Sequence, residues 1–442
     1  MATEEGAARA EEAADPAQES AAFTKGYRYY VLGILTVAYV FNFIDRQILV
    51  ILQESIKVDL DLSDAQLGLL SGFAFAVFYV TVGIPIARWA DRGTRRTIIS
   101  LAIGVWSAMT AVCGIVQNYW QLLGARIGVG VGEAGGSPPA HSMISDMFAP
   151  HERATALSIY NLGIPFGIFV GFLAGGWINE YLGWRYAFFA VGIPGLIFAF
   201  IVRATVREPP RGMSEGIERV ADAPPVFEVI RILWSRRSFR HMSIAAGLHA
   251  FVGYGVGQFM ASFLIRVHDL NSGEAANWLA PVSAIGGGLG TFFGGYLCDK
   301  YGADDARWYV WLPAAAIVIS LPFALFTYLY PWHVPAMVVY MIPVALGSMY
   351  LGPMLSMTHG MVSLRMRAVA SSILFFVLNL IGLGMGPFLT GVVSDVIGRQ
   401  VGDIGTGLRY ALCVVALVNL WCAAHYFYAA KYIRHDLARA PK

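Results

Sequence analysis

The stretch YWQLLGARIGVGVGEAGGSPPAHSMIS, residues 119–145, decides the fold. It is apolar enough to be a membrane helix, yet it carries Arg126 and Glu133 in its interior. These residues are two helical turns apart, so both side chains project from one helix face, roughly 10 Å apart along the axis. Charges inside a membrane segment are costly and rare, and we therefore interpret this pair as functional.

The composition of the whole chain agrees with a membrane protein. Of its 442 residues, 57% are hydrophobic and 14% charged, against roughly 45–50% apolar and about 25% charged in soluble domains. The mean hydropathy is +0.58. The sequence has no serine-hydrolase elbow, HExxH or Walker A motif, so we expect no enzymatic reaction, no metal and no cofactor. The net charge of +2 gives no indication of nucleic-acid binding.

Twelve apolar segments are each near the roughly 20 residues that a membrane helix needs. They cover residues 28–52, 66–88, 97–117, 119–143, 154–178, 184–205, 241–265, 276–298, 308–329, 334–357, 368–394 and 408–431. Placing both termini in the cytoplasm puts most of the 31 basic residues on the cytoplasmic side, as the positive-inside rule requires. We therefore expect an all-α polytopic protein of the plasma (inner) membrane.

The twelve segments form two halves joined by a linker. The expected parts are a disordered tail 1–26, a six-helix bundle 27–206, a cytoplasmic linker 207–240, a second six-helix bundle 241–432 and a cytoplasmic tail 433–442. Within the linker, the apolar spacing over residues 226–237 predicts an amphipathic helix on the inner membrane surface. An acid–base pair follows both the second and the eighth span, and such pseudo-symmetric halves are typical of alternating-access transporters.

The segment after the second span, ARWADRGTRR (87–96), resembles the loop signature of the major facilitator superfamily, G-x-x-x-D-R-x-G-R-R. The matching residues are Asp91, Arg92, Arg95 and Arg96. Ala87 takes the place of the first glycine, and Gly93 sits one position early. RIGVGVGEA (126–134) resembles the span-four motif of the same superfamily. The resemblance implies twelve helices in two pseudo-symmetric bundles.

Four stretches, one of which contains RIGVGVGEA, resemble the Spinster subfamily of lipid transporters. They are FNFIDRQILVI (41–51), RIGVGVGEAGGSPPAHSMISDMF (126–148), YNLGIPFG (160–167) and GWRYAFFAVGIPG (183–195). This resemblance implies proton-coupled movement of a lysophospholipid or a sphingolipid such as sphingosine-1-phosphate, by a monomer. A drug/proton antiporter or an organic-anion/proton symporter are the alternatives within transport, and a non-transporting membrane sensor is the alternative of another class.

Asp45 and Arg126 both lie about 10 Å below the outer surface by residue count. In the resembled fold their spans are neighbours, so we expect them to pair, which makes both charges tolerable in the membrane. Glu133 is near the midplane without a charged neighbour on its own helix. We hypothesise that protonation of Asp45 or Glu133 frees Arg126 and Arg46 to bind an anionic headgroup. A permanent Asp45–Arg126 brace is the alternative for that pair, and an interhelical hydrogen bond without titration is the alternative for Glu133. Arg46 either lines the cavity or reaches the outer interface.

The remaining polar residues of the spans are candidate contacts for substrate or for gating. We expect the substrate also to contact Asn161, His249, Tyr254, Gln258 and Asn379. His249 is in addition a candidate second titrating group. Gating residues are expected at Asp91, Arg92, Arg95, Arg96, Asp299 and Lys300, with Asp91 holding a neighbouring helix end in the outward-facing state. A topology-setting basic loop is the alternative interpretation of these charges.

Overall fold

The computed structural model describes residues 23–214, 225–363 and 366–439, and within these ranges the chain forms helices and turns without strands. Most of the predicted disordered tail, residues 1–22, lies outside the described residues. Lys25 and Gly26 were also expected in this tail, but they belong to the first described helix, whose start is capped by the Thr24 hydroxyl. A side-chain cap satisfies a backbone N–H that would otherwise lack a partner at the helix start.

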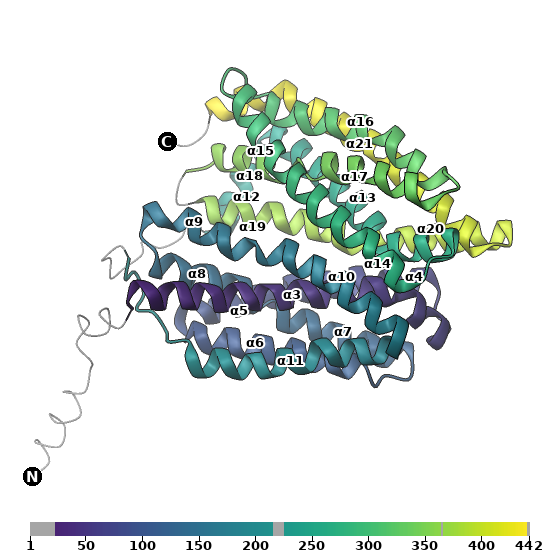
Figure 1. Ribbon diagram of the computed structural model, residues 1–442. Coiled ribbons are helices and arrows are strands. Elements are labelled where there is room, and N and C mark those ends of the chain that lie inside the picture. Colours follow the sequence, from purple (N-terminus) through teal and green to yellow (C-terminus); the bar gives the residue numbers. More distant parts are fainter. Residues whose placement is uncertain (1–22, 215–224, 364–365, 440–442) are drawn as a thin grey trace, which may run out of the picture.

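The first half contains all helices up to Thr205. They are α3 (Lys25–Leu60), α4 (Asp64–Gly68), the π-helix η1 (Leu69–Phe73), α5 (Ala74–Arg92), α6 (Arg95–Cys113), α7 (Tyr119–Glu133), α8 (Ser137–Met147), α9 (Pro150–Asn161), α10 (Gly163–Leu182) and α11 (Trp184–Thr205). In Figure 1 these helices form the lower layer, coloured purple to teal.

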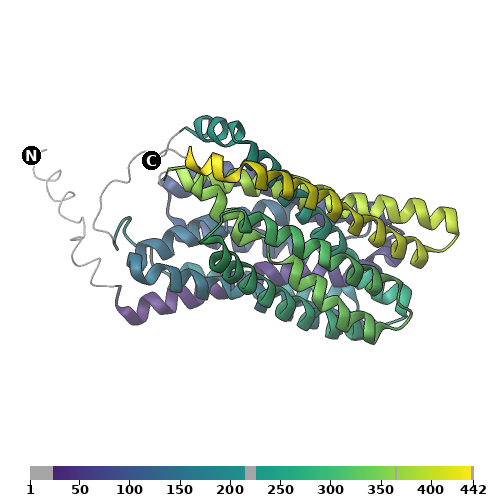
Figure 2. The same cartoon turned by 90° about the horizontal axis from the view of Figure 1, so that it is seen from above.

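The second half forms the upper layer of the same view, in green and yellow (Figure 1). Its elements are α12 (Val226–Ser235), α13 (Arg237–His268), α14 (Ser272–Pro281), the π-helix η2 (Val282–Gly286), α15 (Gly287–Gly302), α16 (Trp308–Leu329), α17 (His333–Gly347), α18 (Leu351–Gly360), α19 (Arg367–Val377), the π-helix η4 (Leu378–Met385), α20 (Gly386–Val401) and α21 (Ile404–Ala438). The long helices of both halves run side by side (Figures 1 and 2).

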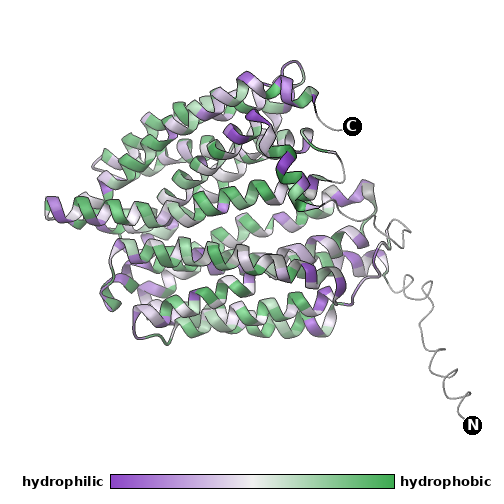
Figure 3. Ribbon diagram, turned by 180° about the vertical axis from the view of Figure 1, so that it is seen from behind, coloured by the Kyte–Doolittle hydropathy of each residue, from purple (hydrophilic) through white to green (hydrophobic). Residues whose placement is uncertain are grey.

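Among the described residues, ten helices are long and apolar enough to cross a membrane. The other two expected spans, 119–143 and 276–298, are helical but do not combine the required length and hydropathy. A turn at residues 134–136 separates α7 from α8, and the run through η2 and α15 is rich in glycine, which lowers its hydropathy. The architecture is consistent with the twelve expected spans. Figure 3 shows hydrophobic residues along the helices.

The linker contains the helix α12, which begins at the predicted residue 226 and ends at Ser235, two residues before the predicted end. Val229 and Leu233 are fully buried against the second half, whereas Phe227 and Trp234, which belong to the predicted apolar face, are 85% and 49% exposed, so the place of this helix on the inner membrane surface stays a prediction. Residues 433–438 of the expected cytoplasmic tail are helical, because α21 continues through them. The buried Asp436 holds this extension by accepting hydrogen bonds from the backbone N–H and the hydroxyl of Ser238, at 2.9 and 2.7 Å.

The hydrophobic core shows where the halves meet. We call the end that holds Lys25 and Ala438 the termini end, and the opposite end the far end. One cluster of buried side chains, including Ile51, Phe263 and Leu408, crosses both halves toward the far end. Toward the termini end each half has its own cluster, apart from Leu383, which packs into the cluster of the first half. The halves are therefore closed on each other at the far end.

Candidate proton and substrate site

The turn at residues 134–136 ends α7 at Glu133, so the expected single helix over 119–143 is wrong. Pro138 and Pro139 occupy the first turn of α8, where a missing N–H is tolerated but where they cannot continue a preceding helix. A Cβ atom at Gly132 would lie 2.6 Å from the Trp106 backbone nitrogen. Glycine therefore lets α7 lie directly on α6, which places Glu133 inside the first half.

Arg126 and Asp45 form the predicted ion pair between α7 and α3. Arg126 Nη1 lies 3.1 Å from Asp45 Oδ1, and the two residues are 2% and 1% exposed. The hydroxyl of Thr110, on α6, donates a hydrogen bond to Asp45 Oδ2. Three helices thus contribute to one buried polar group, and each charge has a partner, as burial requires.

Glu133 also has a charged partner, which comes from another helix. Arg46 Nε donates to Glu133 Oε2 at 2.7 Å. The helix of Glu133 carries no charged residue beside it, and the partner comes from α3. Arg46 therefore does not extend to the outer interface. Its side chain is 26% exposed while that of Glu133 is fully buried, so Arg46 is the member of the network that solvent can reach.

Two atoms of this network have unused hydrogen-bonding capacity. Glu133 Oε1 and Arg126 Nε are buried and have no hydrogen-bond partner among the described residues. Buried polar atoms are nearly always paired, so each such atom in a native structure needs an explanation. A carboxylate oxygen without a donor can accept a proton without losing an existing hydrogen bond.

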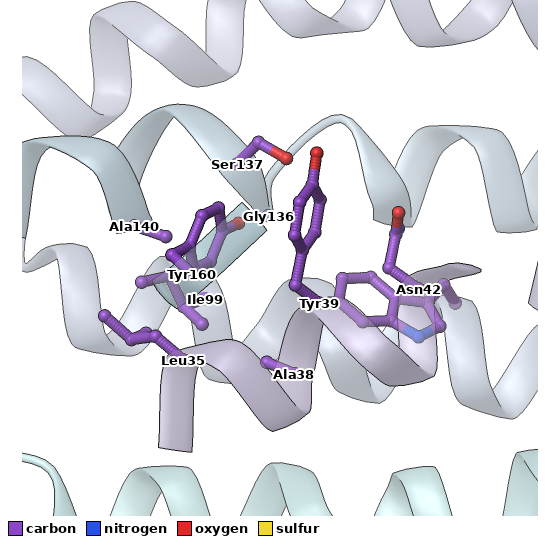
Figure 4. Close-up of a pocket in the computed structure, with 10 residues that line it drawn as sticks. Leu35, Ala38, Tyr39, Asn42, Ile99, Gly136, Ser137, Ala140 and Tyr160 are labelled. Atoms are coloured by element: carbon purple, nitrogen blue, oxygen red, sulfur yellow. The ribbon is translucent and has the colours of Figure 1, made fainter. Parts of the chain in front are cut away.

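A small cavity lies one helical turn from Asp45 and Arg46, between α3, α6 and the start of α8. Its volume is about 10 Å³, the space of about one water molecule. Tyr39 and Asn42 extend from α3 toward Gly136 and Ser137 (Figure 4). Asn42 Oδ1 is buried without a hydrogen-bond partner among the described residues. The cavity therefore offers a polar atom to a water beside the charged network.

The other expected substrate residues lie on several elements. His249 is 4% exposed on α13 and stacks on Tyr350, with ring centroids 4.1 Å apart. Tyr254, one and a half turns further along α13, is 38% exposed. The remaining three are Gln258, half-buried on α13, Asn161, exposed at the end of α9, and Asn379, half-buried in η4. Their contact with substrate stays a prediction.

The expected gating residues make contacts within each half. Arg95 is buried and donates to Glu208 at 2.7 Å, to Asp146, and to Ser142 at 2.8 Å. The Arg96 backbone N–H donates to Glu208 at 2.8 Å. Arg95 therefore fastens the start of α6 to α8 and to the segment that follows α11. Arg92 is exposed, and the side chain of Asp91 lies outside the described set.

In the second half, Asp299 and Lys300 also contact nearby residues. Asp299 accepts a hydrogen bond from the Tyr309 hydroxyl at 2.9 Å, and Lys300 Nζ lies 5.6 Å from the centre of the Tyr301 ring. Sequence reasoning missed Asp146 and Glu208 as partners of Arg95, because they are far along the chain. It also missed an ion-pair network at the far end, which joins residues of α3, α4 and α13.

Comparison with known proteins places the chain among membrane transporters. Residues 35–387 match the family model of the Major Facilitator Superfamily. An MFS-type efflux pump of Mycolicibacterium smegmatis is 30% identical over 410 residues, which cover 92% of this chain and 93% of the relative. The sphingosine-1-phosphate transporter SPNS2 of Xenopus tropicalis is 25% identical over 438 residues, or 93% of this chain and 83% of the relative.

A solved structure is similar over nearly its whole length. It is a bacterial homologue of the human lysosomal transporter Spinster, in an inward-facing and unoccupied conformation. The two chains are 36% identical with a TM-score of 0.86, and the match covers 93% of this chain and 99% of the other. The sequence resemblance to Spinster proteins is therefore confirmed, and the relatives are transporters and not enzymes.

Proposed function

The chain belongs to the major facilitator superfamily of membrane transporters, and we propose that it is a proton-coupled secondary transporter that works by alternating access. The observation that carries this proposal is the buried network of two carboxylates and two guanidinium groups on α3 and α7. A buried charge is tolerable only while its partner is in place. Adding or removing one proton therefore changes which arrangement of the helices is stable.

Glu133 is the proton site in this proposal, and Asp45 holds Arg126 in place. Protonation of Glu133 removes the negative charge that holds Arg46 at 2.7 Å. Arg46 then binds the anionic group of a substrate, because its side chain is the accessible member of the network. Arg126, at 2% exposed, contributes positive potential behind it. In this order of events Arg46 makes the first contact with the substrate, whereas the amino-acid sequence alone favoured Arg126.

The proposed substrate is an amphipathic lipid, either a lysophospholipid or a sphingolipid such as sphingosine-1-phosphate. Support comes from the Xenopus tropicalis relative, which is named as a sphingosine-1-phosphate transporter. A guanidinium group binds phosphate through two parallel hydrogen bonds, which suits a phosphate headgroup. Apolar residues of the second half, including Phe251 and Met349, are the proposed surface for the acyl chain. We place both termini in the cytoplasm and expect a monomer in the inner membrane.

A second candidate is a drug/proton antiporter, and the efflux pump of Mycolicibacterium smegmatis favours it. The two candidates differ in the substrate but share the proton site. A lipid carrier requires the accessible Arg46 for the headgroup, whereas a cationic drug would be repelled by it. Arg46→Gln distinguishes the two candidates. It should abolish the transport of a lipid but leave the efflux of a cationic drug unchanged.

The decisive test is flux in proteoliposomes. We expect a fluorescent lysophospholipid or sphingosine-1-phosphate to cross the membrane only when a pH difference is imposed. A protonophore should stop this flux, and Glu133→Gln should remove its dependence on the pH difference. Flux that persists without any pH difference, or that Glu133→Gln leaves unchanged, would contradict proton coupling at this site. Ligand binding without flux of either lipid or drug would favour the sensor interpretation.

A further inference from the structure

The far end is closed at two related crossings between the halves. At one, the start of α4 packs on α20, and at the other, the start of α14 packs on α10. Each crossing has a glycine on the opposing helix: Gly391 lies against the backbone of Asp64, and a Cβ atom at Gly176 would lie 2.6 Å from Ser272 O. One turn after each glycine comes a carboxylate, Asp395 or Glu180. The internal repeat therefore extends to the contacts that close this end.

The crossing of α4 and α20 is built from charged groups. Asp395 accepts hydrogen bonds from the backbone N–H groups of Asp64 and Ala65, at 3.0 and 2.9 Å. Arg266, on α13, donates two hydrogen bonds to the Asp64 carboxylate, at 2.7 and 2.8 Å. The same carboxylate accepts from the Ser394 hydroxyl at 2.6 Å. Asp64 and Arg266 are nearly fully buried, with side chains 2% and 4% exposed.

Two further residues of α3 complete this charged crossing. Glu54 accepts from Arg266 Nε at 2.7 Å, and Lys57 donates to Asp64 at 2.5 Å. Arg266 is thus held by two carboxylates that both belong to the first half, although it lies in the second. Charge-assisted, two-point hydrogen bonds of this kind are roughly twice as strong as neutral ones.

The crossing of α14 and α10 has the same backbone geometry with weaker contacts. The Ser272 hydroxyl donates to Gly176 O at 2.9 Å and lies 3.3 Å from a Glu180 oxygen. The Asn179 amide donates to Ser272 Oγ at 2.9 Å. No cation joins the halves here among the described contacts, so opening this crossing separates hydrogen-bonded groups but no ion pair.

From this asymmetry we propose that Asp64 and Arg266, with Asp395, form the gate that sets how often the far end opens, and that the α14 crossing contributes little. The proposal rests on alternating access, as stated above. Opening the far end must separate Arg266 from Asp64, because the two residues belong to different halves. Once the buried ion pair is broken, both charges lack a partner until water hydrates them. This free-energy cost holds the far end closed. The gate is distinct from the proton site on α3 and α7.

Distances between spin labels test the gate without measuring transport. Labels at Val58 and Val401, both exposed at the far end, are placed in a chain whose four cysteines are replaced by alanine, in lipid nanodiscs. We expect Arg266→Gln to raise the ratio of long to short distances about tenfold or more. Asp395→Asn should shift the ratio in the same direction by a smaller factor.

The matched control is Arg185→Gln. Arg185 pairs with Asp59 at 2.6 Å at the same end, but both residues belong to the first half and are exposed. This control should leave the distances unchanged, and Ser272→Ala should change the ratio by less than about threefold, as loss of neutral hydrogen bonds does. Equal shifts for Arg266→Gln and Arg185→Gln, or no shift for Arg266→Gln and Asp395→Asn, would overturn the gate.

The test separates this proposal from the proposed transport function. If Arg266→Gln shifts the distances but the protein transports no lipid, the gate is supported and the proposed lipid substrate is wrong. If lipid flux is normal and the distances are unchanged in both gate variants, the proposed transport function stands and the proposed gate is wrong. If Arg266→Gln does not yield a monodisperse protein, Asp64→Asn/Arg266→Gln removes both charges of the ion pair together, and the same shift or its absence decides the outcome.

Discussion

The two halves of the molecule share an arrangement of six helices but bury different groups. The first half buries Asp45, Arg126 and Glu133 in its interior. In the middle of α13 the second half buries His249, which is stacked on Tyr350, and its buried charged residues Arg266 and Asp436 lie near the ends of their helices. The repeated backbone therefore does not require repeated chemistry. The first half, with its buried charges, can respond to protons. The second half provides an apolar surface.

The largest expected effect comes from removing the Asp45–Arg126 ion pair of the first half. Arg126→Ala leaves Asp45 buried without its ion-pair partner, which typically costs about 3–5 kcal/mol of unfolding free energy. We expect a large loss of thermal stability in detergent and no flux. The double variant Asp45→Asn/Arg126→Gln should regain much of the stability, because neither charge remains. A single variant as stable as the parent would show that this pair is not the brace of the first half.

The next effect concerns the proton site. Glu133→Gln keeps the shape and a hydrogen bond to Arg46 but removes the titrating group, so lipid flux should lose its dependence on pH. We expect the flux that a pH difference drives to fall about tenfold or more, which corresponds to about 1.4 kcal/mol. Glu228→Gln, on the exposed face of α12, is the matched control and should change nothing. A retained pH profile in Glu133→Gln would move proton coupling to another group.

A smaller effect is expected in the second half. His249→Phe keeps an aromatic ring against Tyr350, and we expect less than about 1.5 kcal/mol of destabilisation, as for other shape-conserving core substitutions. The pH profile of flux should stay where it is, because the proposal places proton coupling in the first half. A shifted profile would show that His249 titrates during transport and that the second half is not neutral in function.

The smallest effect is expected at a surface ion pair of the second half, whose Asp305 carboxylate is partly covered and whose Arg434 is exposed. Arg307 donates hydrogen bonds to Asp305, and Arg434 pairs with the same carboxylate at 2.6 Å. The hydrogen bond from Arg307 holds the pKa of Asp305 below its usual value. A lowered pKa means that this stabilisation is complete above the unfolded pKa of about 3.9 and is lost as pH falls below it.

Asp305→Asn tests that surface pair. It should cost less than about 1 kcal/mol at neutral pH, since solvent screens surface pairs. The difference in unfolding free energy between variant and parent should shrink at pH values below the usual aspartate pKa. Flux should stay at the parent level. A cost near that of Arg126→Ala would mean that burial does not explain the contrast between the two halves.

Much of the fold could be predicted from sequence, because the apolar segments are long and each backbone group in a membrane helix is satisfied within its own segment. The Asp45–Arg126 pair was also predictable, since residue counts give the two charges equal depth and the resembled fold makes their spans neighbours. The partner of Glu133 was not. Arg46 lies in another helix, and which side chains of two helices meet depends on their rotation and crossing.

The sequence by itself determined which segments are helices, which charges lie inside them, and that the chain consists of two related halves. Only the tertiary structure decided that α7 stops at Glu133, that Arg46 meets it, and that Arg266 reaches across the halves to Asp64. The reason is physical. Helix formation is a local property of neighbouring residues, whereas an ion pair between residues far apart in the chain exists only where the packing of whole helices brings them within 3 Å or so of each other.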